Sequence, residues 1–407
     1  MKSEVKNCGL TKYLFIGRKK YNLSTVIFVV SYFAYLVCAI FSQTEFENTY
    51  DATIINLIQL LAIFLVVVKF FVDETLNVKN LCIWILIILL SLIVSYKTTN
   101  VTIVIPIAAY ILCGSNVDDK IIIKTSFIAI TTMIVITVFS SVIGIIPFKY
   151  TVQTGGRLRY ALGFVYTTFL ANYFFHAILM WLFLKRRCPT LFESFLILIL
   201  NFIIYYLTDT RAVFYETIVL VAVCWIFKAV RHLNRNKLRY LFLIAFIGCA
   251  AIALYIQIFY DPSVVWMKKL NSLLTSRLHF GHKAFVEYGL SFFGQQITWV
   301  SFGASGNYFY VDSSYMNLAV NYGIILLGIL LIGFTFLMNK YIKANKLYCC
   351  IALAFLALHS ITDPQLFSII CNPFLVLLGG FIPLSPKFYF KRSKALPKLT
   401  ANKNALQ

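Results

Sequence analysis

The sequence is poor in charged residues, and especially in acidic ones. Only 13% of its 407 residues are charged, whereas 60% are hydrophobic, and 15 acidic residues stand against 36 basic ones. A soluble domain cannot bury so large an apolar fraction in its core, because much of its surface must be polar. The composition therefore excludes an ordinary soluble protein and predicts that most of the chain faces lipid.

Several motifs of known chemistry are also missing. The ten cysteines lack the spacing of a disulfide framework or a zinc site, and the sequence has no Walker-type GxxxxGK[ST], no HExxH and no clear internal repeat. We therefore expect no metal, no cofactor and no ATP-driven pump. The net charge of +21 is what a basic cytoplasmic face produces in a membrane protein, so we expect no nucleic-acid partner.

Apolar runs of membrane-spanning length recur along the whole chain. A hydrocarbon layer of about 30 Å requires roughly 20 such residues in a helix. The runs and their boundaries predict an all-α polytopic integral membrane protein of about twelve transmembrane helices, in a single membrane domain over 1–407. These helices are expected near 23–41, 51–69, 80–96, 100–114, 121–146, 161–184, 191–207, 212–228, 239–258, 313–338, 347–360 and 367–385.

The distribution of Lys and Arg predicts the orientation of these helices. If the amino terminus is cytoplasmic, about 27 of the 36 basic residues fall on the inner side and nine on the outer side. Basic loops are preferentially retained in the cytoplasm during insertion. Both termini are therefore predicted to be cytoplasmic, and residues 259–312 form a long extracytoplasmic loop.

Four arginines are placed on the outer side, at or near expected helix boundaries. They are Arg157, Arg159, Arg211 and Arg277. A guanidinium group is a planar fork of donors that binds phosphate oxygens in pairs and stays charged. The four arginines are therefore predicted to bind a lipid-linked phosphate or diphosphate. The alternative is that each reaches toward headgroups or pairs with an acid, as Arg211 can with Asp209.

The segment 154–164, TGGRLRYALGF, carries two of these arginines just before an expected helix. A helix amino terminus attracts anions, which favours a phosphate site there. The alternative is a loop with two solvated charges. The same helix carries Asn172, which either supports the site or bonds a neighbouring helix, and His176, for which packing is the simpler interpretation.

The long outer loop contains apolar residues at helical spacing over 273–289. This pattern predicts a short amphipathic helix at the membrane surface, with Arg277 and His282 near headgroup depth. His282 is a candidate base, although a lone surface histidine often has no such role. A glycine-containing linker at 303–308 lets the chain turn back toward the bilayer.

Asp312 and Tyr315 open the tenth expected helix. Asp312 either caps that helix or accepts a proton from a sugar hydroxyl near the outer arginines. His359 and Asp363, at the outer end of the eleventh helix, are weaker candidates of the same kind.

Five motifs follow one another between Gly155 and Leu378. They are GGRLRYALGF at 155–164, TDTRAVF at 208–214, LLTSRLHFGHKAFVEYG at 273–289, FFGQQI at 292–297 and VDSSYMNLAVNYGII at 311–325. In this order, with a long outer loop between them, they resemble the bacterial lipid-linked oligosaccharide polymerases of the O-antigen and capsular polysaccharide type (Wzy-type), which are related to O-antigen ligases.

The resemblance implies inverting, metal-independent glycosyl transfer between two undecaprenyl-diphosphate-linked glycans at the outer face of a bacterial cell membrane. Arg211 and Arg277 match arginines of the family's helix-start and loop-helix motifs. Asp312 stands where the related ligases carry a histidine, which favours a polymerase. A chain-length regulator and a flippase are the further partners that we expect.

Two alternative functions remain open. One is an O-antigen-ligase-type transferase that delivers finished glycan to another acceptor. The other is a flippase or transporter for the lipid-linked oligosaccharide, which would carry charges in the middle of several helices and have related halves. With the exception of Glu216, the charged residues are expected at helix ends. This distribution favours the polymerase over a transporter.

Overall fold

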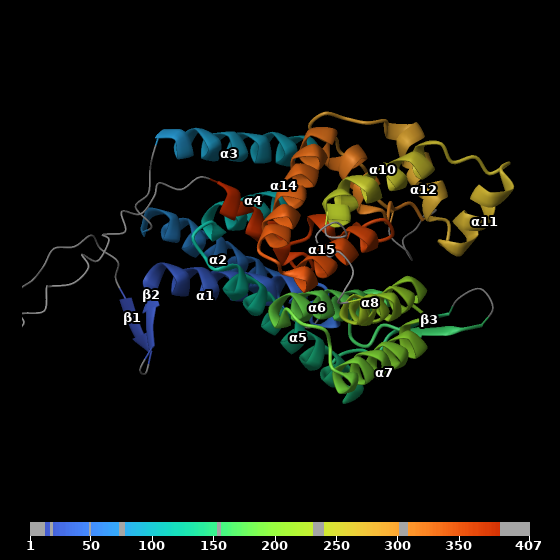
Figure 1. Cartoon of the computed structure of the whole chain (residues 1–407), viewed down its shortest axis with the longest axis horizontal. Helices are drawn as coiled ribbons and strands as arrows, with labels where there is room; N and C mark the ends of the chain where they lie inside the picture. Colours follow the sequence, from blue (N-terminus) through green and yellow to red (C-terminus); the bar gives the residue numbers. More distant parts are fainter. Residues whose placement is uncertain are drawn as a thin grey trace, which may run out of the picture.

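The apolar runs form helices that pack side by side, with two small strand pairs at the edges (Figure 1). The computed structural model describes residues 13–16, 19–48, 50–72, 78–152, 156–230, 240–300 and 308–382. Within these ranges, seven helices are long and apolar enough to cross a membrane. The chain thus has the fold of a mainly helical, multi-pass membrane protein. The predicted cytoplasmic termini and the basic tail lie outside the described residues.

Eleven of the twelve predicted segments contain apolar helices. The seven long ones are α1 (Leu23–Phe41), α2 (Ala52–Val72), α3 (Val78–Thr98), α5 (Asp119–Val142), α7 (Leu191–Thr208), α8 (Arg211–Ala229) and α14 (Ile324–Lys343). The shorter ones are α4 (Val101–Gly114), α6 (Phe169–Lys185), α10 (Ala245–Ile258, after the 3-10 turn η2, Phe242–Ile244) and α15 (Leu347–His359). How many of them cross the bilayer stays a prediction.

The remaining elements are short. A 3-10 turn, η1 (Glu45–Asn48), follows α1. The antiparallel strand pairs are β1 (Tyr13–Ile16) with β2 (Lys19–Asn22), and β3 (Tyr150–Val152) with β4 (Leu158–Tyr160). In the long loop, the predicted amphipathic helix is confirmed as α12 (Arg277–Tyr288), and a second helix, α11 (Val265–Leu273), was not predicted. Of the glycine-containing linker, residues 303–307 lie outside the described part of the chain.

The twelfth predicted helix, 367–385, is wrong. The chain instead forms two 3-10 turns, η4 (Pro364–Phe367) and η5 (Pro373–Phe381), and each begins at a proline, which has no backbone donor. The side-chain amide of Asn372, which lies between the two turns, donates a hydrogen bond of 2.7 Å to the Leu366 carbonyl. Nine residues of 3-10 helix extend only about 18 Å, which is too short to cross a hydrocarbon layer.

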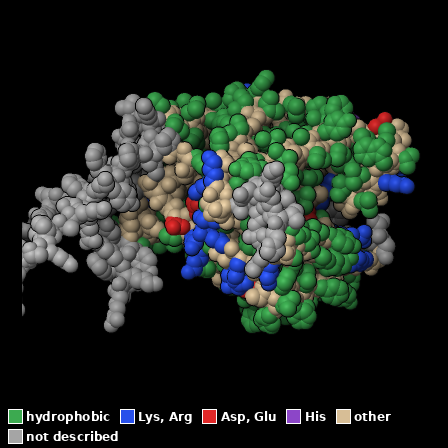
Figure 2. Space-filling view, viewed as in Figure 1, with side chains coloured by type: hydrophobic (Ala, Val, Ile, Leu, Met, Phe, Trp, Pro, Cys, Tyr) green, Lys and Arg blue, Asp and Glu red, His purple; other side chains and the backbone are tan. Residues whose placement is uncertain are grey.

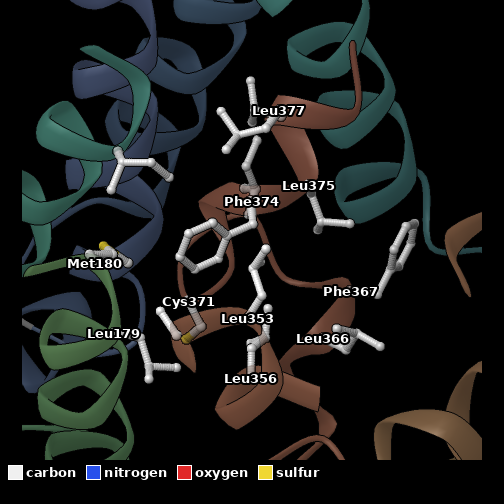
Figure 3. Close-up of a cluster of buried hydrophobic side chains, with 14 of the residues drawn as sticks. Leu179, Met180, Leu353, Leu356, Leu366, Phe367, Cys371, Phe374, Leu375 and Leu377 are labelled. Atoms are coloured by element: carbon white, nitrogen blue, oxygen red, sulfur yellow. The ribbon is translucent and has the colours of Figure 1, made fainter. Parts of the chain in front are cut away.

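The carboxyl-terminal turns fill the interior of the bundle instead. Figure 3 shows Phe374 of η5 among Leu179 and Met180 of α6 and Leu353 of α15, and all four side chains are fully buried. Further contacts join η5 to α4, α5 and α14. The apolar run at the carboxyl end is therefore part of the protein core, and its hydrophobicity reflects burial by protein rather than contact with lipid.

The tenth predicted helix, 313–338, is broken near its start. A four-residue helix, α13 (Ser314–Asn317), leads into a π-helical turn, η3 (Leu318–Tyr322), and the chain then bends at Gly323 before α14 begins. Gly323 has a φ of +100°, which lies in the region that favours glycine. The break therefore comes from a backbone conformation that apolar periodicity does not reveal.

A segment of the long loop closes this break. The Ile324 amide donates to the Ser291 carbonyl at 2.9 Å, and the Gln295 amide donates to the Asn321 carbonyl at the same distance. The Gln295 side chain also donates to the Val320 carbonyl at 2.9 Å. These bonds satisfy buried backbone groups that the interrupted helix leaves without intrahelical partners. The loop is thereby anchored to the start of α14.

Replacing Gly323 with Ala is expected to destabilise the protein by more than about 2 kcal/mol. A Cβ there would come within 2.5 Å of the Gly294 nitrogen and the Phe292 carbonyl oxygen, and the backbone is already at positive φ. Thermal unfolding in detergent measures the effect. Gly328→Ala in the same helix is the matched control, because its Cβ would meet nothing within 4 Å. Equal melting of the two variants would contradict the account of the break.

Charged residues mark the two ends of the bundle. Figure 2 shows hydrophobic side chains over most of one face, with Lys and Arg mainly in two groups. At one end Asp119 accepts from Lys340 Nζ at 2.7 Å and from the Tyr341 hydroxyl at 2.6 Å. Since α5 begins there and runs to Val142, the loop after α5 lies at the other end. That end is the predicted outer one and carries the candidate site.

Candidate functional site

A short hairpin brings two of the outer arginines to the corner between α7 and α8. Arg157 precedes β4 and Arg159 lies within it, paired across the hairpin with Thr151. Arg159 Nε donates to the Thr208 carbonyl at the end of α7, at 2.7 Å. The hairpin is thus fixed to the α7–α8 corner. Gly155, the first residue of the corresponding motif, lies outside the described residues.

Asp209 is the carboxylate around which this corner is organised. It caps α7 in the left-handed conformation, at φ +51°, and its side chain is only 2% exposed. Its Oδ1 lies 2.9 Å from Arg157 Nη1 and 3.4 Å from Arg211 Nε, so the suggested pairing of Arg211 with Asp209 is confirmed. The two arginine side chains are 42% and 64% exposed, so donors remain on both that can reach a ligand.

Arg277 lies in a second ion pair. It is the first residue of α12, and its Nε lies 3.0 Å from Oδ2 of Asp312. The two side chains are 21% and 24% exposed, so the pair is accessible from outside. Asp312 does not cap the next helix, because the N-cap residue of α13 is Ser313. The interpretation of Asp312 as an N-cap is therefore wrong, and its carboxylate lies beside Arg277.

The four arginines form one group, which we call the arginine cluster (Arg157, Arg159, Arg211 and Arg277). Burial lowers the pKa of the Arg159 guanidinium, Asp209 opposes this effect, and the positive charges of the other three arginines add to it. Charges act on one another in this way only over short range. Four guanidinium groups and two carboxylates leave the site with a net charge of +2.

The arginine cluster has the chemistry of an anion site. Arginine forks bind phosphate oxygens in pairs, and excess positive charge at the end of an apolar bundle attracts a charged headgroup. No family model, curated protein or solved structure matches this chain. What the cluster binds is therefore inferred from its own residues.

A network of four polar side chains (Asn172, Glu216, His359 and Asp363), of which all but the partly buried Glu216 are buried, lies beside the cluster. His359 Nδ1 lies 2.6 Å from Glu216 Oε2, and Asn172 donates to Asp363 Oδ2 at 2.5 Å. His359 Nε2 is 3.9 Å from Asp363 Oδ1. The charge of Arg277 acts on both His359 and Asp363. The network therefore joins α6, α8 and α15 directly behind the proposed anion site.

The backbone that follows α15 also fixes the start of α13. The Ser314 hydroxyl donates to the Asp363 carbonyl, and the Ser314 amide donates to the Ser360 carbonyl at 3.0 Å. The Tyr315 hydroxyl donates to the Ala357 carbonyl at 2.8 Å, and its ring is fully buried. Tyr315 therefore supports the site through packing and does not face a substrate. Asp312 lies just before this fixed segment, so α15 helps to position its carboxylate.

Asn172→Ala is expected to lower the free energy of unfolding by about 1–3 kcal/mol, because it leaves the buried Asp363 carboxylate without a donor. Thermal unfolding of the detergent-solubilised protein measures the loss. The control is Thr131→Ala in α5, where the hydroxyl bonds only carbonyls of its own helix. A melting temperature of the Asn172 variant equal to that of the control would contradict a structural role for this bond.

His282 is not brought into the arginine cluster. Its Nδ1 faces the carbonyls of Gln257 and Ile258 at 3.2 and 3.0 Å, and its ring packs near Tyr260. It follows Arg277 by five residues on α12, which places it about 140° away around the helix. The structure therefore gives no support for His282 as a base at this site.

The helix expected to begin at residue 161 starts only at Phe169. Leu162 and Gly163 both have positive φ, and a Cβ on Gly163 would lie 2.8 Å from the Thr137 carbonyl oxygen. Residues 161–168 therefore form turns and no α-helix. The predicted contribution of this helix terminus to the site of Arg157 and Arg159 is therefore wrong. His176 of α6 is buried with its ring 5.2 Å from that of His359, in agreement with a packing role.

Sequence reasoning missed the partners of two acidic residues. Glu216 was recognised only as a charge within an apolar helix, and nothing in the sequence indicated its bond to His359. Asp363 was a weak candidate base, whereas the structure buries it against Asn172 and Ser314. The available signal was that each is an acid in apolar surroundings, where a buried charge requires a partner.

Proposed function

We propose that this protein is a polysaccharide polymerase of the bacterial cell membrane. It transfers a growing glycan from undecaprenyl diphosphate onto an incoming lipid-linked repeat unit at the outer face. The observation that carries this proposal is the arginine cluster, with four guanidinium groups at one end of an apolar bundle. A diphosphate on a lipid carrier is an anion that reaches such a site from within the membrane. The motif order that resembles the polymerases supports the same assignment.

In the proposed reaction, the arginine cluster stabilises the leaving diphosphate. As the bond between the sugar C1 and the phosphate oxygen breaks, the electron pair stays on that oxygen, and the guanidinium groups neutralise its charge. Fixed donors are effective here because they require no reorganisation when the charge develops. Arg159 and Arg157 are held by Thr208 and Asp209, so the cluster is preorganised in this sense.

Asp312 is the proposed base. It accepts the proton of the acceptor hydroxyl while that oxygen forms a bond to C1 on the face opposite the diphosphate, which inverts the configuration. The buried network does not contact the reacting atoms. It fixes Asp363, and the backbone carbonyls of Asp363 and Ser360 in turn hold Ser314, two residues after Asp312.

The proposal is tested in cells from which the gene for this chain has been deleted. Lipid-linked glycans from such cells should carry single repeat units, whereas a normal ladder of chain lengths would contradict the proposal. Polymer that forms normally but stays on its lipid carrier would indicate the ligase-type transferase. Single repeat units that remain protected from a membrane-impermeant glycosidase would indicate a flippase, because the glycan would still face the cytoplasm.

A further inference from the structure

Both carboxylates of the site occupy donors that a diphosphate would use, but in different settings. The Asp209 side chain is 2% exposed and forms ion pairs with Arg157 and Arg211 as part of the α7–α8 corner. Asp312 is 24% exposed and contacts Arg277, which is itself 21% exposed. Asp209 is therefore a buried structural residue of the corner, whereas Asp312 lies where an incoming ligand can reach it.

We propose that Asp312 is a resident ligand of Arg277 that the substrate diphosphate displaces, and that this displacement releases Asp312 to act as the base. The inference rests on the proposed function, because it assigns an order of events to the same site. Asp209 has the opposite role: it stays paired and keeps Arg157 and Arg211 in place when the diphosphate binds.

The exchange follows from the charges. Before a ligand binds, Oδ2 of Asp312 is already engaged as an acceptor, because Arg277 Nε donates to it at 3.0 Å. A diphosphate carries more negative charge and more acceptor oxygens than one carboxylate, so it competes successfully for the Arg277 fork. Once Arg277 has turned to the diphosphate, Oδ2 of Asp312 is free to accept the proton of the acceptor hydroxyl.

This exchange couples donor binding to acceptor activation. Before the donor is bound, Oδ2 of Asp312 is occupied by Arg277. After binding, the hydroxyl proton passes to Asp312, the hydroxyl oxygen bonds to C1, and the diphosphate leaves with the electron pair of the broken C1–O bond. The donor is thus required before the acceptor is activated.

The inference predicts opposite effects of two chemically identical substitutions on diphosphate binding. Asp312→Asn removes the competing charge and should tighten binding of inorganic diphosphate by about two- to fivefold, the effect of losing one partly exposed ion pair. Asp209→Asn keeps the left-handed cap, which asparagine tolerates, but releases two arginines and should weaken binding severalfold. Asp261→Asn is the control, because this exposed acid of the same loop bonds only near its own turn.

The experiment titrates inorganic diphosphate, undecaprenyl diphosphate and phosphatidylglycerol in micelles against the full-length protein in detergent. A second variant, Asp312→Ser, excludes an effect peculiar to asparagine, and each variant must melt as a single transition. Tighter binding of both diphosphates to both Asp312 variants, with no change for phosphatidylglycerol, is expected. Unchanged or weaker diphosphate binding to the Asp312 variants overturns the exchange, and an equal gain for phosphatidylglycerol overturns it as a diphosphate-specific event.

The two proposals fail in different ways. If the deletion strain makes a normal ladder of chain lengths, the polymerase assignment fails, yet the effect on inorganic diphosphate still decides whether Asp312 is a displaceable ligand. If the deletion strain accumulates single repeat units that the glycosidase reaches, and the Asp312 variants do not bind diphosphate more tightly, the polymerase assignment stands and the exchange is refuted.

Discussion

Arg277→Lys is expected to abolish polymer, with a loss of transfer rate of at least about 100-fold. Lysine keeps the positive charge but lacks the planar fork, so it cannot hold two oxygens of a diphosphate at once. The variant also loses the Nε contact to Asp312, which in the native protein is 3.0 Å long. Complementation of the deletion strain, followed by a gel of lipid-linked glycans, measures the effect at matched expression.

The matched control is Lys283→Arg, in the same helix as Arg277. Lys283 lies outside the arginine cluster, 3.6 Å from Glu287 and over the ring of Phe309. Its replacement should leave the distribution of chain lengths unchanged. Arg211→Lys is expected to lose polymer as well, since its side chain is the most exposed of the three cluster arginines that form an ion pair. Native chain lengths in the Arg277 variant would rule out a phosphate-binding role for that side chain.

Asp312→Asn is expected to reduce transfer by about 100- to 10,000-fold, the contribution that a positioned base makes to such a step. The amide keeps the shape of the side chain and still accepts from Arg277, but it does not take up a proton at neutral pH. The same complementation assay reports the loss. Because this variant should bind diphosphate more tightly than the native protein, loss of transfer cannot be ascribed to loss of the donor.

Asp261→Asn provides the control for charge in the long loop. Asp261 is exposed and accepts from the Ser263 amide at 2.8 Å, away from the arginine cluster. We expect native chain lengths from this variant. Full activity of Asp312→Asn at equal expression would exclude Asp312 as the base.

The positions of the helices were predictable because long apolar runs end at charged or turn residues. α1, α7 and α8 begin and end within about two residues of their expected bounds, since Asn22, Thr190 and the Asp209–Thr210 corner interrupt the apolar pattern. The amphipathic pattern of the long loop likewise predicted α12. Local composition is sufficient wherever local contacts decide the conformation.

Burial by protein and contact with lipid could not be distinguished from the sequence. Both require apolar side chains. The apolar sequence of η5 was therefore predicted to be a transmembrane helix, although the segment lies in the protein core. The break at Gly323 depends on its close approach to Phe292 and Gly294, which belong to a distant segment. Such features arise from tertiary contacts and have no periodic signature.

The same distinction explains what was predictable in the candidate site. The pairing of Arg211 with Asp209 was foreseen because the two residues are neighbours at a helix boundary. The pairs Arg157–Asp209 and Arg277–Asp312 join distant parts of the chain, and only the fold brings them together. The outer arginines were recognisable as exceptions to the positive-inside rule, but their partners were not.

The most direct test of the polymerase proposal is transfer by the purified protein. Lipid-linked single repeat units extracted from the deletion strain are incubated with the full-length protein in detergent, and the products are separated by size. We predict a ladder of lipid-linked oligomers that the Arg277→Lys protein does not produce. Single repeat units that remain unchanged in the presence of native, folded protein would contradict the account.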